Sequence, residues 1–236
     1  IYINNNEGNK MNILKKTIGV LAVSALCMTS VSADSSAFKG IYVGVGAAVN
    51  GVALDGNFKD PSNMDGTTTE SKGSHGAIEP SVHGEIGYNL ALGEGFFVSV
   101  GASLTPVDAS ISGSNVTNSK TVTLELSDLE SYYIEPSVML TDNTALFLKF
   151  ATVEGDFTAR GKDLDTATVS NLDGETMAVG TKIVTDSGVF LKAEMGVTTF
   201  DTINITNISD DAGTNLASSQ VEAEMGYGSL TFGFIF

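Results

Sequence analysis

The side chains that could carry out catalysis or bind a transition metal are few, and none lies in a recognised motif. The chain has two histidines, His75 and His83, and a single cysteine, Cys27. Neither a G-x-S-x-G nor an H-E-x-x-H segment occurs, so the sequence indicates no activated serine and no two-histidine metal site. We therefore expect that the chain is not an enzyme and that it needs no cofactor.

Carboxylates pair up in two polar segments, where they could contact a hard cation. Asp163 and Asp165 lie in one segment, and Asp210 and Asp211 lie in the other. Carboxylate oxygens suit Ca²⁺ and Mg²⁺, but the ligand spacing of an EF-hand loop is missing. The sequence predicts no specific metal site and leaves open a loose association of divalent cations near lipopolysaccharide.

A second group of ionisable residues alternates with apolar residues along segments that have the pattern of β-strands. Four glutamates, three lysines and one histidine share the less apolar face of these segments, so their charges nearly balance. These residues are Glu79, His83, Glu85, Glu135, Lys149, Lys182, Lys192 and Glu194. Unpaired charges are costly away from water, so in a narrow barrel we expect these groups to pair across the lumen.

The apolar residues recur with a period of two, which predicts strands rather than helices. Eight runs have strand length, namely 40–50, 77–90, 96–106, 131–141, 145–154, 174–185, 189–200 and 226–236. Short turns join the second run to the third, the fourth to the fifth and the sixth to the seventh, whereas long polar connections join the others. Short turns at one end and long loops at the other are typical of outer-membrane barrels. We therefore predict an all-β fold, an eight-stranded antiparallel up-and-down transmembrane β-barrel.

A soluble barrel would alternate in the same way, with its apolar face inside. Three observations favour the membrane barrel, in which the apolar face meets lipid. The other face is rich in glycine, serine and alanine, which suits a narrow interior. Its ionisable residues nearly balance, and the excess of acidic residues lies in the predicted loops.

The four-residue word Glu-Pro-Ser-Val occurs twice, at 79–82 and at 135–138. Proline donates no hydrogen bond to a strand ladder and belongs at edges or bulges. Because a closed barrel has no edge, we expect a bulge or a missing ladder bond at Pro80 and at Pro136. The repeat indicates either duplicated hairpins or a chance recurrence.

The first 33 residues have the features of an export signal. Residues 11–33 begin with lysines, continue with an apolar stretch too short to span a bilayer, and end with small residues before Ala33. This pattern predicts a signal peptide that is cleaved after Ala33. Residues 1–10 are interpreted as a mistranslated leader, which leaves 34–236 as the barrel domain. The net charge of −16 argues against a nucleic-acid partner.

The last run ends in phenylalanine and carries large apolar residues on one face, at Leu230, Phe232, Phe234 and Phe236. With this run, and with the segment 133–144, the chain resembles the OmpA-type small eight-stranded outer-membrane β-barrels of the barrel-only, porin-like or opacity-like kind. The resemblance implies a place in the outer membrane of a Gram-negative bacterium, among its lipid and lipopolysaccharide. It also implies that the barrel-assembly machinery reads the final strand as its assembly signal.

Such a barrel usually carries aromatic residues at both membrane interfaces. The chain has no tryptophan, so other aromatic residues would have to form this girdle. The candidates are Tyr42, Tyr88, Phe96, Phe97, Tyr132 and Phe236.

The expected function is that of a structural outer-membrane protein with long acidic surface loops for contact or adhesion and a lumen plugged by Glu/Lys pairs. The alternative is a small, non-specific diffusion porin with a weak preference for cations. The sequence names no surface ligand or permeant solute, and it leaves the oligomeric state open.

Overall fold

The computed structural model describes residues 34–60, 69–106, 109–114, 121–160, 168–208 and 217–236. A short 3-10 helix, η1 (Ser35–Phe38), precedes the strands. The strands are β1 (Gly40–Asp60), β2 (Thr69–Gly93), β3 (Phe96–Thr105), β4 (Ala109–Ser114), β5 (Thr121–Thr141), β6 (Thr144–Arg160), β7 (Thr168–Val169), β8 (Leu172–Val184), β9 (Val189–Phe200), β10 (Ile203–Ile208) and β11 (Ala217–Ile235). Within these residues, no helix has the length and hydrophobicity needed to cross a bilayer.

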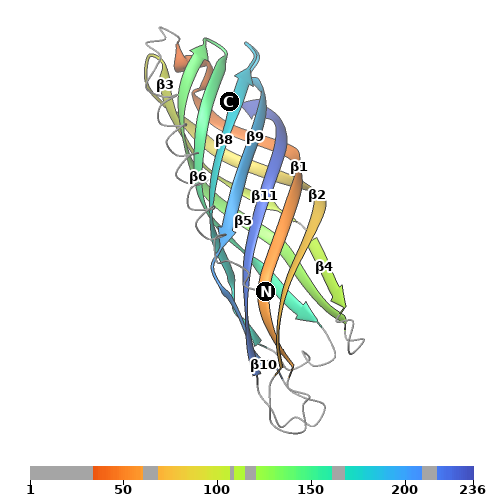
Figure 1. Ribbon diagram of the computed structural model, residues 1–236. Helices are drawn as coiled ribbons and strands as arrows, with labels where there is room; N and C mark the ends of the chain where they lie inside the picture. The colour runs from red at the N-terminus through yellow and green to blue at the C-terminus, as the bar shows by residue number, and fades with distance from the viewer. Residues whose placement is uncertain (1–33, 61–68, 107–108, 115–120, 161–167, 209–216) are drawn as a thin grey trace, which may run out of the picture.

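The strands form one antiparallel sheet that closes on itself, because β1 pairs with β2 on one side and with β11 on the other. Three of the eight barrel strands are each divided into two shorter strands. One consists of β3 and β4, which both pair with β5, and another of β9 and β10, which both pair with β11. The third consists of β7, which pairs with β10, and β8, which pairs with β6 and β9. The predicted eight-stranded antiparallel barrel is confirmed, and its strands run obliquely along a long cylinder (Figure 1).

The three short turns lie together at one end of the barrel, with the C-terminus (Figure 1, top). Gly95 and Gly188 lie in two of these turns with φ angles of 81° and 82°, a conformation that costs glycine little and other residues more. We call this end the short-turn end.

At the opposite end, the prediction of long polar loops is wrong. β1 continues to Asp60 and β2 begins at Thr69, so most of the segment between the first two predicted runs is strand. β2 alone has 25 residues, whereas about 9–11 residues of tilted strand cross a membrane. The barrel therefore protrudes well beyond the bilayer at this end, which we call the protruding half.

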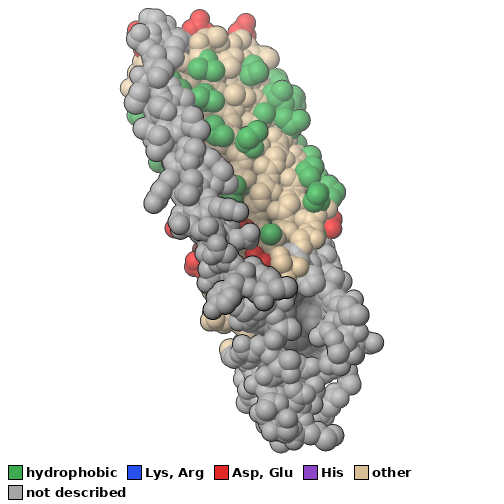
Figure 2. All heavy atoms as spheres, viewed as in Figure 1, with side chains coloured by type: hydrophobic (Ala, Val, Ile, Leu, Met, Phe, Trp, Pro, Cys, Tyr) green, Lys and Arg blue, Asp and Glu red, His purple; other side chains and the backbone are tan. Residues whose placement is uncertain are grey.

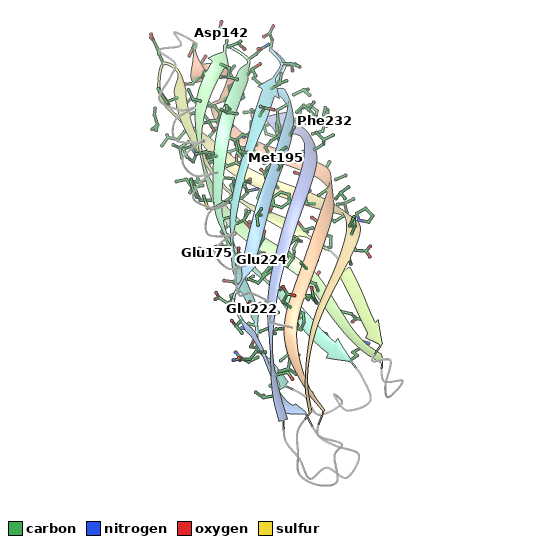
Figure 3. All side chains as sticks on the ribbon, in the orientation of Figure 1. Asp142, Glu175, Met195, Glu222, Glu224 and Phe232 are labelled. Carbon is green, nitrogen blue, oxygen red and sulfur yellow. The ribbon has the colours of Figure 1, made fainter. Side chains whose placement is uncertain are left out.

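In the half near the short turns, which we call the lipid-facing half, nearly all outward side chains are apolar. Ile41, Val45 and Val49 of β1 are exposed by 53%, 68% and 56%. Figure 2 shows hydrophobic side chains spread over this part of the wall, and Figure 3 places Met195 and Phe232 on it. Two outward positions, Val138 and Leu148, have little exposed surface. An apolar wall of this kind is suited to lipid and not to water.

The polarity of the two faces reverses further along the same strands. On β1, Val52 and Leu54 point inward and are buried, while Asp55 points outward and is exposed. The neighbouring strand β11 shows the same reversal, because Val221 is buried and Glu222 is exposed. The protruding half therefore has the apolar-in, polar-out pattern of a soluble barrel. The predicted lumen of small and polar residues is confined to the lipid-facing half.

A buried apolar cluster fills the protruding half. Its members are Val52, Leu54, Leu126, Leu129, Val153, Phe157, Leu172, Phe200, Ile203, Ile205, Val221, Ala223 and Met225. We call this cluster the upper core, although Figure 1 draws this half of the barrel toward the bottom. Its buried side chains come from β1, β5, β6, β8, β9, β10 and β11, and their burial holds the protruding strands together.

In the lipid-facing half, aromatic rings fold over glycines on the neighbouring strand. Five direct cross-strand pairs do this: Tyr42–Gly87, Tyr133–Gly101, Phe147–Gly180, Phe190–Gly233 and Tyr227–Gly196. At Gly101, for example, a Cβ atom would lie 2.7 Å from the Tyr133 ring. The glycines let large rings lie flat against the wall, so the rings fill the lumen.

The predicted aromatic girdle is wrong at two positions. Tyr42 and Phe97 point into the lumen and are buried. Their backbone positions alternate with lipid-facing neighbours, so period two directs them inward. The other candidates, Tyr88, Phe96 and Tyr132 on the wall and Phe236 at the C-terminus, are exposed.

The two prolines leave the strand register intact, so the predicted bulge is absent at both. At Pro80 the ladder to β1 is continuous, and β2 pairs with β3 only from Gly84 onward. At Pro136 the ladder between β5 and β6 passes from Ile134 to Ser137 without a change of register and without intervening pairs. The alternative expectation, a missing ladder bond, fits Pro136.

Candidate functional site

Three carboxylates and three ammonium groups meet in the lumen of the lipid-facing half. They come from five different strands, and each residue is at most 7% exposed. The group consists of Glu85 on β2, Glu135 on β5, Lys149 on β6, Lys182 on β8, and Lys192 and Glu194 on β9. We call it the lumen network. Its formal charges cancel, as burial of ionic groups in a low-dielectric interior requires.

Lys192 is the centre of the lumen network, because its ammonium group reaches all three carboxylates. Its Nζ forms a close ion pair with Oε2 of Glu85, and it lies 3.3 Å from Oε1 of Glu135 and 3.7 Å from Oε2 of Glu194. The strand register explains the central position of this side chain. Lys192 lies opposite Lys182 on β8, two residues from Glu194 on the same face of β9.

Lys149 joins the network from the side of the protruding half. Its Nζ is 3.2 Å from Oε1 of Glu194 and 3.9 Å from Oε1 of Glu135. It also lies 4.3 Å from the ring centroid of Tyr133, a distance at which a cation is attracted to an aromatic face. Tyr227 donates a 2.5 Å hydrogen bond to Oε1 of Glu194. Charged, aromatic and hydroxyl groups thus share one packed layer.

Lys182 lies at the short-turn side of the network, where aromatic rings surround it. Its Nζ is 3.5 Å from Oε2 of Glu135 and 4.6 Å from the ring centroid of Tyr42. Three further rings lie within 6.0 Å, those of Phe97, Phe147 and Phe190. The Tyr42 hydroxyl is 2.8 Å from the Tyr133 hydroxyl. This contact links the rings around Lys182 to Tyr133, whose ring contacts Lys149.

The other two predicted lumen residues lie outside the lumen network. His83 is half-buried in the lumen, and its Nε2 is 2.8 Å from Oγ1 of Thr231. Glu79 lies on the same face of β2, nearer the protruding half, and forms no ion pair with another described residue. Alternation assigns a residue to the lumen, but it does not say at which depth along the barrel the residue finds a partner.

The sequence interpretation missed the three tyrosines of the network, Tyr42, Tyr133 and Tyr227. Each occupies an inward position with a glycine directly opposite on the next strand. That combination is visible in the sequence once the register is known. It marks the rings that fold across the lumen and bring their hydroxyl groups to the charged side chains.

A cavity of about 80 Å³ lies between the lumen network and the upper core. Lys149 and Glu194 line one side of it, and Leu129, Val153 and Met225 line another. The rest of the lining is mostly hydroxyl groups, including Ser81, Ser103, Ser131 and Ser229. This volume suits a handful of water molecules.

Among the described residues, no three His, Cys, Asp or Glu side chains gather as a metal site. Asp163, Asp165, Asp210 and Asp211 lie outside the described residues, as does the side chain of His75. The absence of a metal, cofactor or catalytic site stays a prediction.

The predicted assembly signal forms an outward stripe along the end of β11 and the C-terminal residue that follows it. Leu230, Phe232, Phe234 and Phe236 are exposed by 45% to 78%, and the Phe232 and Phe234 rings pack edge to face with centroids 6.0 Å apart. The geometry suits a lipid-facing strand. Recognition by the assembly machinery stays a prediction.

No family model matches the sequence, and no curated protein matches it significantly. Solved structures do match. The outer-membrane protein OprG of Pseudomonas aeruginosa has a TM-score of 0.57 at 9% identity, over 84% of this chain and 97% of OprG. The outer-membrane protein AlkL has a TM-score of 0.50 at 14% identity, over 88% of this chain and 93% of AlkL.

The attachment invasion locus protein Ail of Yersinia pestis matches with a TM-score of 0.42 at 11% identity, over 84% of this chain and 99% of Ail. At these identities, the similarity of OprG and AlkL concerns the fold alone. The closed eight-stranded barrel and its apolar wall identify the chain as a small β-barrel protein of the bacterial outer membrane.

Proposed function

We propose that this chain is a structural outer-membrane protein whose lumen does not conduct and whose protruding half presents acidic surfaces for contact with other molecules. The observation that carries the first part is the lumen network. Three ammonium groups lie among three carboxylates in one layer packed with aromatic rings. An ion could cross this layer only by separating buried pairs, which costs several kcal/mol.

The second part rests on like charges that face each other across the outer wall. Glu130 lies directly opposite Glu154, which in turn lies opposite Asp173 on the next strand, and Asp55 lies opposite Glu222. All five are exposed. Directly opposed like charges destabilise a sheet, so bound cationic groups would stabilise this wall. Suitable partners are basic groups of a surface ligand, or divalent cations that bridge to lipopolysaccharide phosphates.

Single-channel recording in a planar bilayer tests the closed lumen. We expect the unmodified protein to give no conductance steps above the leak. The variant Lys192→Ala removes the central ammonium group and should produce steps, whereas Lys39→Ala, an exposed lysine outside the strands, should stay silent. Frequent steps from the unmodified protein would contradict the proposal.

The same recordings decide on the second candidate, a small diffusion porin. The cavity beside the network favours it, because the hydroxyl and charged groups in its lining could form part of an aqueous path. A porin of this type would conduct without any substitution. Its acidic protruding half would also make potassium more permeant than chloride, which reversal potentials in a salt gradient measure.

The contact surface can be tested with vesicles of zwitterionic lipid that carry the protein. At low ionic strength, where exposed charges interact over the longest range, they should bind to immobilised polylysine. The triple variant Glu130→Gln, Glu154→Gln and Asp173→Asn should bind several times more weakly. The matched control neutralises three exposed acids of the short-turn end, Glu94, Asp142 and Asp186. Equal binding of both triple variants would contradict a specific surface on the protruding half.

We also propose that the chain has no enzymatic activity. The described histidine side chain, His83, contacts a threonine hydroxyl inside the barrel, where lipid substrates in the membrane do not reach it. A turnover assay with purified outer-membrane lipid tests this. A reaction that the unmodified protein catalyses and that His83→Gln abolishes would contradict the proposal.

A further inference from the structure

The residues that precede β1 occupy the mouth of the barrel at the short-turn end. Phe38 of η1 is fully buried, and its ring stacks on Phe97 with centroids 4.9 Å apart and an interplanar angle of 17°. The Phe38 carbonyl accepts a 2.6 Å hydrogen bond from Nδ2 of Asn89, whose Oδ1 accepts one of 2.6 Å from Ser99. Both polar partners are fully buried. Phe38 is thus held inside the mouth by apolar and polar contacts together.

The start of η1 is tied to two of the short turns. Oγ of Ser35 donates a 2.9 Å hydrogen bond to the carbonyl of Gly93, the last residue of β2 before the turn to β3. The backbone N–H of Asp34 donates a 3.3 Å hydrogen bond to Oδ1 of Asp142, between β5 and β6. Figure 3 shows Asp142 at this end of the barrel. Residues 34–38 therefore bridge two turns across the mouth.

Asp34 also caps η1 with its own side chain. Its Oδ1 accepts a 2.9 Å hydrogen bond from the backbone N–H of Ser36, and its Oδ2 accepts one of 2.7 Å from the Ser36 hydroxyl. These hydrogen bonds lower the pKa of the Asp34 carboxyl, so the cap is ionised at neutral pH. The backbone nitrogen of Asp34 therefore lies on an ordered turn, within hydrogen-bond reach of the Asp142 carboxylate.

This position coincides with the cleavage site that the sequence predicts. Hydrolysis by signal peptidase adds one water across the Ala33–Asp34 peptide bond, which leaves a carboxylate on Ala33 and an α-ammonium group on Asp34. We propose that Asp142 is the binding site for this new amino terminus, and that processing thereby locks residues 34–38 as a cork in the mouth of the barrel. The inference depends on the cleavage site and is independent of the proposed function.

Cleavage replaces the neutral backbone N–H of Asp34 with a charged α-ammonium group at the same position. A hydrogen bond with an ionised donor and acceptor is roughly twice as strong as a neutral one. The pair is exposed to solvent, where such pairs are weak, so we expect an effect of about two- to fivefold. Phe38 should contribute far more, because it is the buried part of the cork.

A single reporter cysteine can measure whether the mouth is closed. Ala145 is fully buried in the same apolar cluster as Phe38, and the chain from Asp34 onward contains no cysteine. Mature Ala145→Cys protein should therefore react slowly with a charged maleimide. Adding Phe38→Ala should raise the rate by at least about tenfold, given the cost of emptying a buried phenylalanine site. Phe38→Leu keeps a large apolar side chain in the mouth, so labelling of this variant should stay slow.

The role of the amino terminus needs a second comparison on the same reporter. Acetylation of the α-amino group and the variant Asp142→Asn should each raise the labelling rate about two- to fivefold, and together no further, because both remove one interaction. Asp186→Asn changes an exposed acid of another short turn and should leave the rate unchanged. Folding of every variant is checked by the heat-dependent shift in gel mobility.

Two results would overturn the inference. Equal labelling of the intact protein and of Phe38→Ala would show that Phe38 does not close the mouth. If neither acetylation nor Asp142→Asn changes the labelling rate, the amino terminus is not bound by Asp142. Neither result depends on whether the barrel conducts or binds a cationic surface.

Discussion

The variant Lys192→Met tests whether the lumen network stabilises the barrel as one unit. The side chain is 2% exposed and contacts Glu85, Glu135 and Glu194, so the variant leaves three carboxylates with two ammonium groups. Removing one partner of a buried ion pair costs about 3–5 kcal/mol, because the remaining charge stays buried without compensation. Methionine has a similar length and fills the space, so this loss is electrostatic rather than a packing defect.

The free energy of unfolding can be measured in lipid vesicles by urea titration, followed by the circular dichroism of the sheet. Lys39→Met makes the same substitution at an exposed site and should change stability by less than about 0.5 kcal/mol. The double variant Lys192→Met/Glu85→Gln restores charge balance and should recover more than half of the loss. A loss below about 1 kcal/mol for Lys192→Met, or no recovery in the double variant, would refute the reasoning.

Three further predictions use the same unfolding measurement. Gly101→Ala should cost about 1–3 kcal/mol, because its Cβ would lie 2.7 Å from Tyr133, whereas Gly226→Ala, with no atom within 4 Å of its Cβ, should be close to neutral. Leu172→Ala removes a fully buried side chain from the upper core and should cost about 2–5 kcal/mol. Tyr227→Phe loses the hydrogen bond to its carboxylate partner and should cost about 1.5–3 kcal/mol.

The closed barrel could be predicted from the sequence because lipid imposes a strict rule on the strands. Nearly every outward position of the lipid-facing half is apolar, so Val43 and Val45 alternate visibly with Gly44 and Gly46. The same alternation predicts a lumen position for Lys192, whose side chain is buried. Short turns such as the one at Gly188 could also be predicted, because only a few residue types favour tight turns.

The protruding strands could not be predicted in the same way, because water imposes a weaker rule. Their outward residues vary between charged, polar and small, and segments such as 55–60 and 69–76 show no apolar period. Their inward residues form the upper core, but Val52 and Leu54 are isolated apolar residues until the strands that cover them are known. Burial there depends on partners far away in the sequence, which no local pattern encodes.

The contents of the lumen follow from what surrounds the barrel at each level. In the protruding half, water lies outside, and burial of apolar side chains inside gives a net hydrophobic stabilisation. In the lipid-facing half, the hydrocarbon outside is as apolar as leucine, so moving an apolar side chain from the wall to the lumen gains little. Stabilisation there must come from ion pairs, hydrogen bonds and close packing of rings. The lumen network and its tyrosines therefore lie at the level of the apolar wall, where Lys192 is flanked by the outward Leu191 and Ala193.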